Sequence, residues 1–421
     1  MTRTKTSLFG LLIAIFFAVV PVRVEAEFTQ APQSAATVPA TAAFDEVWRT
    51  VRDKFYDRAL HGLDWNAIGD RYRPLAATAA TERERAAVIN RMLAELHASH
   101  TGYYTRDETA YYDLADIFSW GLRHQLESAF PDGKVAYTGI GIFTRSIDGR
   151  TFVSGVLSGL PADKAGLIVG DELLAADGAP FAPVGSFADK SGHKVTLTIR
   201  RSRDGDPERL TVVPERIEPN AAFLDAMRAS TKVIERGGVR IGYIHVWSYA
   251  RNDYQALLAE QISTGPLKDA DALIWDLRDG WGGAVPDYLD IFNARAPTMV
   301  TTDRGGGHSV VNAKWRKPAA LLINGGTRSG KEVLAYGFKK YGYGPVIGTP
   351  SAGALLAARA FLFEGGGLLL LPVADVAVDG ERLEGRGVTP TIEVPFEIPY
   401  AAGADPQLER AIDELARTVG G

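Results

Sequence analysis

The chain has 421 residues and no cysteine, which excludes disulfide bonds, a thiol nucleophile and lipid attachment to cysteine. It also lacks any concentration of positive charge. The net charge is -5 and the Lys and Arg residues are scattered, so the basic surface that nucleic-acid binding requires is absent and no nucleic-acid partner is expected. Hydrophobic residues make up 46% of the chain, enough for a large core. The length predicts a globular protein of about two to four domains.

The N-terminus has the order of segments found in secretory signal peptides. Arg3 and Lys5 precede an apolar run from Leu8 to Val20, and a candidate cleavage site, V-E-A, ends at Ala26. This order predicts a signal peptide over residues 1–26, cleaved after Ala26, and a periplasmic or secreted protein. An uncleaved anchor is the alternative, but the run is shorter than the ~20 apolar residues that a membrane span prefers. No stable membrane span is expected after removal.

Changes in composition and periodicity divide the rest of the chain. Residues 27–41 are rich in Ala, Pro, Thr and Gln and predict a linker. Apolar residues at helical spacing, with Thr81 as a candidate N-cap, predict an N-terminal helical domain over residues 42–130. Short strands and turns predict a β-rich domain over 135–216. Apolar strands alternate with helices over 217–421 and predict an α/β core with a central sheet, so the fold class is multidomain α/β (α+β overall).

Two motifs lie in the β-rich segment. The first reads GIGI, and the second reads SGLPADKAGLIVGDELLAADG from Ser158 to Gly178. Together they resemble a PDZ domain, in which a glycine-containing loop and the strand after it bind a peptide C-terminus. The residues that this resemblance implies for peptide binding are Gly139, Ile140, Gly141 and Ile142. The alternative is a β module whose glycines only permit tight turns.

The stretch LLINGGTRSGKEVLAYG leaves Ser329 at a Gly-rich turn between a strand and a helix. GGTRSGK also fits a phosphate-binding loop, but Glu332 follows where a Mg-binding Ser or Thr is needed, and its carboxylate would repel phosphate. Ser329 as a turn former or helix cap is the structural alternative to a nucleophile.

Residues 239–395 resemble the carboxyl-terminal processing, or tail-specific, protease family. Four stretches carry the resemblance: YIHVWSY, ALIWDLRDGWGGA, LLINGGTRSGKEVLAYGFKKYG and LEGRGVTP. It implies a serine peptidase in which Ser329, three residues before Glu332, is the nucleophile. Helical domain, PDZ domain and protease core also follow the order of that family.

The chain departs from the family at the base that activates the serine. Many members use a lysine about 25 residues downstream of the serine, and the corresponding stretch GTPSAGALLA has Ala354 at that place. Lys331 and Lys340 do not replace it by motif. Because a serine hydroxyl is a weak nucleophile without a base, another proton acceptor is needed.

A histidine supplies the alternative base. His100 lies in ELHASHTGYY, which resembles a segment of the tricorn-like branch of the same superfamily, where Ser and His act with a Glu. In that branch the Glu precedes G-V-x-P, and LEGRGVTP places Glu384 there. The resemblance implies that Glu384 orients His100, with Ser99 as the assisting serine.

Other roles stay open for these residues. His100 can cap a helix end, and Glu384 can be a solvated turn carboxylate beside Arg382 and Arg386. His97 and His100 lack the spacing of a zinc motif and no third ligand follows, so neither a metal nor another cofactor is expected.

An oxyanion site needs fixed N–H donors, and backbone groups supply them without reorganisation. The DGWGG turn resembles the oxyanion segment of the family, which implies Gly283 with its neighbour Gly282, together with the N–H of Gly330 after the nucleophile. These glycines can also simply relieve a tight turn.

The sequence therefore predicts an exported serine endopeptidase that binds polypeptide substrates through a PDZ domain and cleaves them through an acyl-enzyme. The alternatives are an inactive PDZ-bearing scaffold, in which Ala354 records lost activity, and a hydrolase of small molecules. Substrate sequence and oligomeric state are not readable from the residues.

Overall fold

A computed structural model describes residues 41–311 and 314–420. The predicted signal peptide and nearly all of the predicted linker lie outside the described residues. No helix among the described residues is both long enough and apolar enough to cross a membrane.

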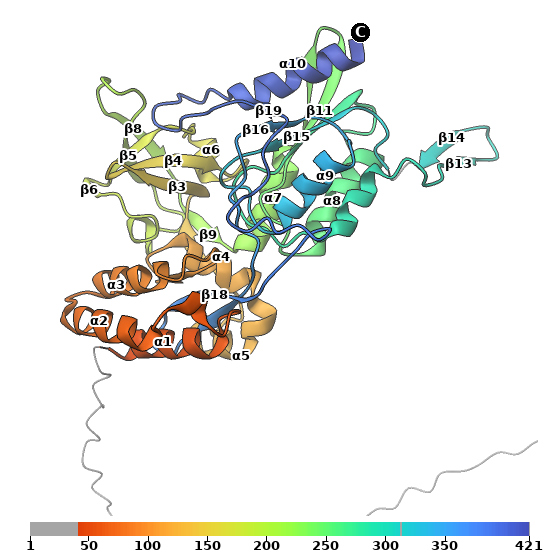
Figure 1. The fold of residues 1–421 in the computed structure, drawn as a ribbon. Coiled ribbons are helices and arrows are strands. Elements are labelled where there is room, and N and C mark those ends of the chain that lie inside the picture. Colours follow the sequence, from red (N-terminus) through yellow and green to blue (C-terminus); the bar gives the residue numbers. More distant parts are fainter. Residues whose placement is uncertain (1–40, 312–313, 421) are drawn as a thin grey trace, which may run out of the picture. The chain divides into compact units, whose positions relative to one another are not determined.

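Helices dominate the first part of the described chain (Figure 1). Residues Phe44, Val47 and Val51 are buried on one face of the first helix, as their spacing predicts. The Thr81 side chain accepts a hydrogen bond from the Glu84 N–H at 3.1 Å, which confirms the predicted N-cap. The elements are α1 (Ala42–Lys54), η1 (Leu60–Gly62), α2 (Trp65–Thr78), α3 (Glu82–Ala94), β1 (Gly102–Tyr104), α4 (Thr109–Ile117) and α5 (Ser119–Ala129).

A hairpin from late in the chain completes this helical part. β17 (Ala357–Leu362) and β18 (Leu368–Ala374) are antiparallel, and β18 also pairs with β1. Figure 1 shows β18, in blue, among the red and orange helices. Leu369 and Leu371 pack against α1 to α3, while Leu368 and Leu370 pack with α4 and α5. Alternate side chains of β18 point in opposite directions, so this strand contributes to two apolar cores. Its pairing with β1 also holds the residues just before β1 beside the C-terminal half of the chain.

A β module occupies residues 137–217. Its main sheet has the order β3-β4-β5-β7-β8, so β3 is an end strand, and β2 pairs separately with β9. The elements are β2 (Tyr137–Gly139), β3 (Ile142–Ile147), β4 (Arg150–Val156), α6 (Pro161–Lys164), β5 (Glu172–Ala176), β6 (Ala179–Pro180), η2 (Gly185–Phe187), β7 (Val195–Arg200), β8 (Glu208–Val212) and β9 (Glu215–Ile217).

Most of the remaining elements form a central sheet with helices on both faces, and residues 299–302 and 308–311 form a separate hairpin. The strand order is β10-β11-β12-β15-β16-β19, and all neighbours after the antiparallel β10–β11 pair are parallel. The elements are α7 (Pro219–Ser230), β10 (Lys232–Arg236), β11 (Val239–His245), α8 (Asn252–Ser263), β12 (Ala272–Asp276), η3 (Pro286–Phe292), β13 (Met299–Thr302), β14 (His308–Val311), β15 (Ala319–Ile323), α9 (Gly330–Lys340), β16 (Val346–Gly348), β19 (Ile392–Glu393) and α10 (Pro406–Gly420).

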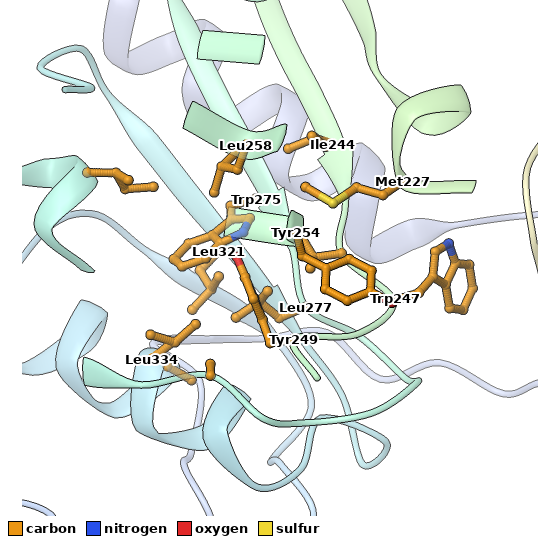
Figure 2. Packing of buried hydrophobic residues seen from close by; sticks show 14 of the residues in the cluster. Met227, Ile244, Trp247, Tyr249, Tyr254, Leu258, Trp275, Leu277, Leu321 and Leu334 are labelled. Carbon is orange, nitrogen blue, oxygen red and sulfur yellow. The ribbon is translucent and has the colours of Figure 1, made fainter. Parts of the chain in front are cut away.

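Alternate residues of these strands enter different layers of the core. On β12, Leu273 and Trp275 face α7, α8 and α9, while Ala272 and Ile274 face α10. Figure 2 shows Trp275 among Tyr249, Tyr254, Leu258, Leu321 and Leu334 on the first of these faces. Each fully buried large apolar side chain stabilises the fold by about 1.5–3 kcal/mol. Because the central strands β12 and β15 are covered on both faces, every side chain along them is buried, which explains the continuous apolar runs in the sequence.

The last helix begins at a side-chain cap and packs one apolar face on the central sheet. The Asp405 carboxylate accepts a hydrogen bond from the Leu408 N–H at 2.9 Å at the start of α10. Ala411, Ile412 and Leu415 are buried against the sheet. The predicted fold class, an α/β protein with helices and several sheets, is confirmed, whereas the domain boundaries stay a prediction.

Candidate active site

Ser329, Gly282 and Gly283 all lie beyond the carboxyl ends of neighbouring parallel strands. The turn with the two glycines follows β12, and Ser329 lies between β15 and α9. Because β12 and β15 are adjacent and parallel, both loops emerge at the same edge of the sheet. This edge is where open α/β sheets build their sites.

Ser329 has a strained backbone. Its φ is 57° and its ψ is −134°, which a residue with a side chain rarely adopts. The Ser329 N–H donates to the Ala354 carbonyl at 2.8 Å and to the Glu332 carboxylate at 3.2 Å, so two contacts hold the turn. A serine on a strained turn from strand to helix has the backbone of a nucleophile elbow, which presents the hydroxyl at the top of the sheet.

The glycines around Ser329 are required because neighbouring backbone and side-chain atoms leave no room for a Cβ atom. A Cβ atom on Gly282 would lie 2.4 Å from the Ser329 Cβ, and one on Gly330 would lie 2.3 Å from the Ala284 backbone. Gly283 has a φ of 101°, which L-residues rarely adopt. The N–H groups of Gly283 and Gly330 donate no hydrogen bond within the described chain. The backbone therefore brings two uncommitted donors close to the serine.

His100 connects to Glu384 through Ser99. The Ser99 hydroxyl donates to the Glu384 carboxylate at 2.8 Å and lies 3.3 Å from Nδ1 of His100. The Ser99 N–H also donates to Glu384, at 2.9 Å. The N–H groups of Leu355 and Leu356 donate to the same carboxylate at 2.8 and 3.2 Å. Glu384 is thus fixed by groups from both halves of the chain.

The pKa of His100 depends on its burial and on two nearby charges of opposite sign. Burial, and next the Arg328 guanidinium, lower the pKa of His100 to about 4, against the raising effects of Glu384 and of the Leu356 backbone. The ordinary histidine pKa of ~6.5 therefore does not hold for His100 in the fold. At neutral pH the imidazole is uncharged and can accept a proton.

Ser329 and His100 line one cavity of about 310 Å³. No hydrogen bond joins the two side chains in the part of the chain that the structure describes. Catalytic hydrogen bonds often tighten only when substrate is bound, so a shared cavity is the relevant geometry. Its other lining residues are Leu114, Ile117, Phe118, Ala250, Trp281, Gly282, Gly283, Arg328, Ala357, Ala358 and Leu370.

Glu332 is part of the support of the nucleophile turn. Its buried carboxylate accepts hydrogen bonds from the Ser351 hydroxyl at 2.6 Å and from the N–H groups of Gly353 and Ala354 at 2.7 and 2.8 Å. Together with the contact to Ser329, these bonds attach the loop after β16 to the turn. Ala354 lies directly beside Ser329, and its methyl group offers no proton acceptor there.

Lys331 has a structural role that the sequence did not reveal. Its side chain is fully buried, and Nζ donates to the carbonyls of Asp279 at 2.8 Å and Trp247 at 3.2 Å. Burial lowers the pKa of Lys331 to about 7. The amine therefore ties α9 to the loops after β11 and β12. A lysine in the first turn of a helix opposes the helix dipole, which is the one sequence signal that could have marked it.

The candidate peptide-binding loop begins the β module. The carbonyls of Ile140 and Gly141 accept hydrogen bonds from Ala162 at 2.9 Å and Leu157 at 3.0 Å. The N–H groups of the same two residues donate to no other residue of the described chain. Gly139 ends β2 and Ile142 begins β3, the end strand of the sheet.

Metal ligands do not gather around these residues. His97 is exposed, and over residues 41–311 and 314–420 no group of three or more His, Cys, Asp or Glu side chains is arranged to hold a metal ion.

The fold is similar to those of two solved proteases. It aligns with the photosystem II D1 C-terminal processing protease at a TM-score of 0.50 and 17% identity, over 87% of this chain and 98% of that one. It aligns with the tricorn protease at a TM-score of 0.52 and 19% identity, over 91% of this chain and 37% of that one.

Sequence comparison supports the resemblance to a peptidase family. Residues 240–394 match peptidase family S41, and residues 40–94 match the tricorn protease C1 domain. The first match covers the region that resembles the carboxyl-terminal processing proteases, and it confirms that resemblance. Relatives of this chain include the carboxyl-terminal-processing protease of Synechocystis sp., 25% identical over 90% of this chain and 88% of the relative. They also include tricorn protease homolog 1 of Streptomyces coelicolor, 26% identical over 88% of this chain. The chain spans 34% and 32% of the lengths of the two Streptomyces relatives that it matches.

Proposed function

We propose that the chain is an exported serine endopeptidase that cleaves polypeptides through an acyl-enzyme. One observation carries the proposal: a strained serine shares a cavity with a histidine that is linked through Ser99 to the half-buried carboxylate of Glu384. Export rests on the order of residues 1–26 alone.

The proton path follows from the hydrogen bonds of Ser99. The Ser99 hydroxyl donates to Glu384, so its oxygen can accept from Nδ1–H of His100. This tautomer leaves Nε2 of His100 as the base. Ser329 Oγ attacks the substrate carbonyl carbon while its proton passes to Nε2, and the carbonyl electron pair moves to the oxygen.

Collapse of the tetrahedral intermediate completes acylation. The C–N bond breaks, the amine takes the proton from His100, and the acyl group stays on Ser329. Water then attacks the ester by the same route and releases Ser329. The N–H groups of Gly283 and Gly330 stabilise the oxyanion in both steps, because they are fixed and uncommitted.

The β module serves as a PDZ-like recognition domain in this proposal. The free N–H groups of Ile140 and Gly141 suit a terminal carboxylate, and the unpaired edge of β3 suits strand addition by an extended peptide.

Mass-spectrometric detection of labelling by a small fluorophosphonate tests the proposal. We expect the mature protein to gain the phosphonyl group at Ser329 and at no other serine, because only this hydroxyl has a base and an oxyanion site. The alternative, an inactive scaffold, is favoured by the methyl group of Ala354 where many relatives have a lysine. Absence of labelling at every pH at which the protein is folded, with and without a peptide that binds the β module, would support the scaffold.

The close approach of Gly282 to the serine supplies a second test. Gly282→Ala places a Cβ atom 2.4 Å from the Ser329 Cβ, and we expect kcat for peptide cleavage to fall at least about 100-fold. Gly325→Ala is the matched control, because a Cβ atom there meets nothing within 4 Å. Equal activities of the two variants would contradict the proposed geometry.

A further inference from the structure

Arg328 is a cation without a carboxylate partner at the candidate active site. It directly precedes Ser329 and lines the same cavity, whose other walls are mostly apolar. No carboxylate lies within ion-pair distance of its guanidinium among residues 41–311 and 314–420. Its hydrogen bond within the described chain is a long one of 3.4 Å, from Nε to the Gly326 carbonyl.

The carboxylates on the surrounding loops are committed elsewhere. Glu384 accepts hydrogen bonds from Ser99, Leu355 and Leu356. Asp279 accepts from the Asn324 amide at 2.9 Å. Neither needs Arg328 as a counter-ion, so the protein itself leaves this charge uncompensated.

A rigid aromatic surface orients the guanidinium. Arg328 lies over the Trp281 ring at 5.4 Å from the ring centroid. The Trp281 indole N–H donates to the buried Asp113 carboxylate at 3.1 Å, which fixes the ring. An Arg stacked on an aromatic face keeps its N–H groups available in the plane of the guanidinium, where they can bind a carboxylate with two hydrogen bonds.

The charge also bears on the reaction. After burial, Arg328 is the largest influence that lowers the pKa of His100, and Glu384 is the charged group that opposes it. Proton transfer from Ser329 makes His100 a cation beside this Arg. A substrate carboxylate on Arg328 would offset the repulsion at the step where the imidazolium forms.

We propose that Arg328 binds a carboxylate of the substrate and thereby selects peptides that carry this group next to the scissile bond. The carboxylate is either the terminal α-carboxylate or the side chain of an acidic residue. This inference rests on the proposed peptidase function, and it assigns to that site a substrate class.

Two matched peptide pairs show whether Arg328 binds the terminal α-carboxylate or an acidic side chain. The first pair differs only in a free or amidated C-terminus close to the scissile bond. The second pair is amidated and differs only in Glu or Gln beside that bond. For one pair we expect kcat/KM of the wild type to be about 10- to 100-fold higher for the carboxylate peptide, as a charge-assisted bidentate contact provides.

Arg328→Met keeps a long side chain over Trp281 and removes the charge. We expect it to lose this preference, which is read as the ratio of the two kcat/KM values within one peptide pair and not from the rate on either peptide alone. Arg410→Met, on the exposed face of α10, removes the same charge elsewhere and should retain the preference. Equal wild-type rates within both pairs, or a preference that survives in Arg328→Met, would overturn the inference, because the carboxylate would then be read elsewhere.

If the wild type cleaves none of the peptides, that result counts against the proposed function alone. A binding measurement then still tests the role of Arg328. Fluorescence anisotropy then compares the same labelled peptides on Ser329→Ala and on Ser329→Ala/Arg328→Met. We expect tighter binding of the carboxylate peptide to the first variant and no difference for the second. Identical affinities for both variants would refute the role of Arg328.

Discussion

Ser329→Ala is expected to reduce kcat for peptide cleavage by about 10⁴- to 10⁶-fold, the loss typical of removing a nucleophile from a serine peptidase. The physical reason is that no other hydroxyl in the cavity occupies the turn beside Gly282 and Gly283. The measurement is the rate of release of a fluorescent group from a quenched peptide. Residual cleavage can be followed over days because the chain has no thiol that could replace the serine.

The fold should survive this substitution. Alanine keeps the same strained φ of 57°, and the Ser329 hydroxyl donates no hydrogen bond within the described chain, so the unfolding midpoint should change little. Ser263→Ala, near the end of α8, is the matched control and should keep full activity. Wild-type activity in Ser329→Ala would mean that another residue carries the reaction.

His100→Asn is expected to lower both kcat and the rate of fluorophosphonate labelling by about 10⁴- to 10⁶-fold, because the serine loses its proton acceptor. Asparagine is chosen over alanine because His100 has a φ of 51°, which Asn adopts more readily. Loss of both readouts together separates a missing base from a failure to bind peptide, which would raise KM alone.

The pH profile of the wild type gives the sign of the effect. The base must be neutral, and the fold lowers the pKa of His100 to about 4, so kcat/KM should stay level from pH 7 to about 5 and fall towards pH 4. The same shift favours the unfolded state, which binds the proton more readily, as the pH falls from the ordinary value of ~6.5. Tryptophan fluorescence at each pH controls for unfolding. A decline centred near pH 6.5 in folded protein would show that His100 is not held in this environment.

Local signals in the sequence predicted much of the fold. The N-cap at Thr81 and the apolar face of α1 depend on residues within one or two turns of each other. The alternation of apolar strands with helices predicted an α/β core with a central sheet, and continuous apolar runs suit strands whose two faces are both covered.

The candidate site was only partly accessible from the sequence. Motifs pointed to Ser329, His100, Ser99 and Glu384, but Ser99 and Glu384 lie 285 residues apart and no periodicity relates them. Their contact depends on the pairing of β1 with β18, and the apolar pattern wrongly predicted that β18 belongs to the central sheet of residues 217–421. The roles of Lys331 and Arg328 were missed for the same reason.

The sequence by itself determined where helices and strands form and which reactive side chains stand at the turns between them. Backbone hydrogen bonds and the periodicity of apolar residues act over short distances, so neighbouring residues are enough to specify them. Only the tertiary structure decided the low pKa of His100, the burial of Lys331 and the unpaired charge of Arg328. These properties depend on desolvation and on charges from distant segments, and they exist only when the chain has brought those segments together.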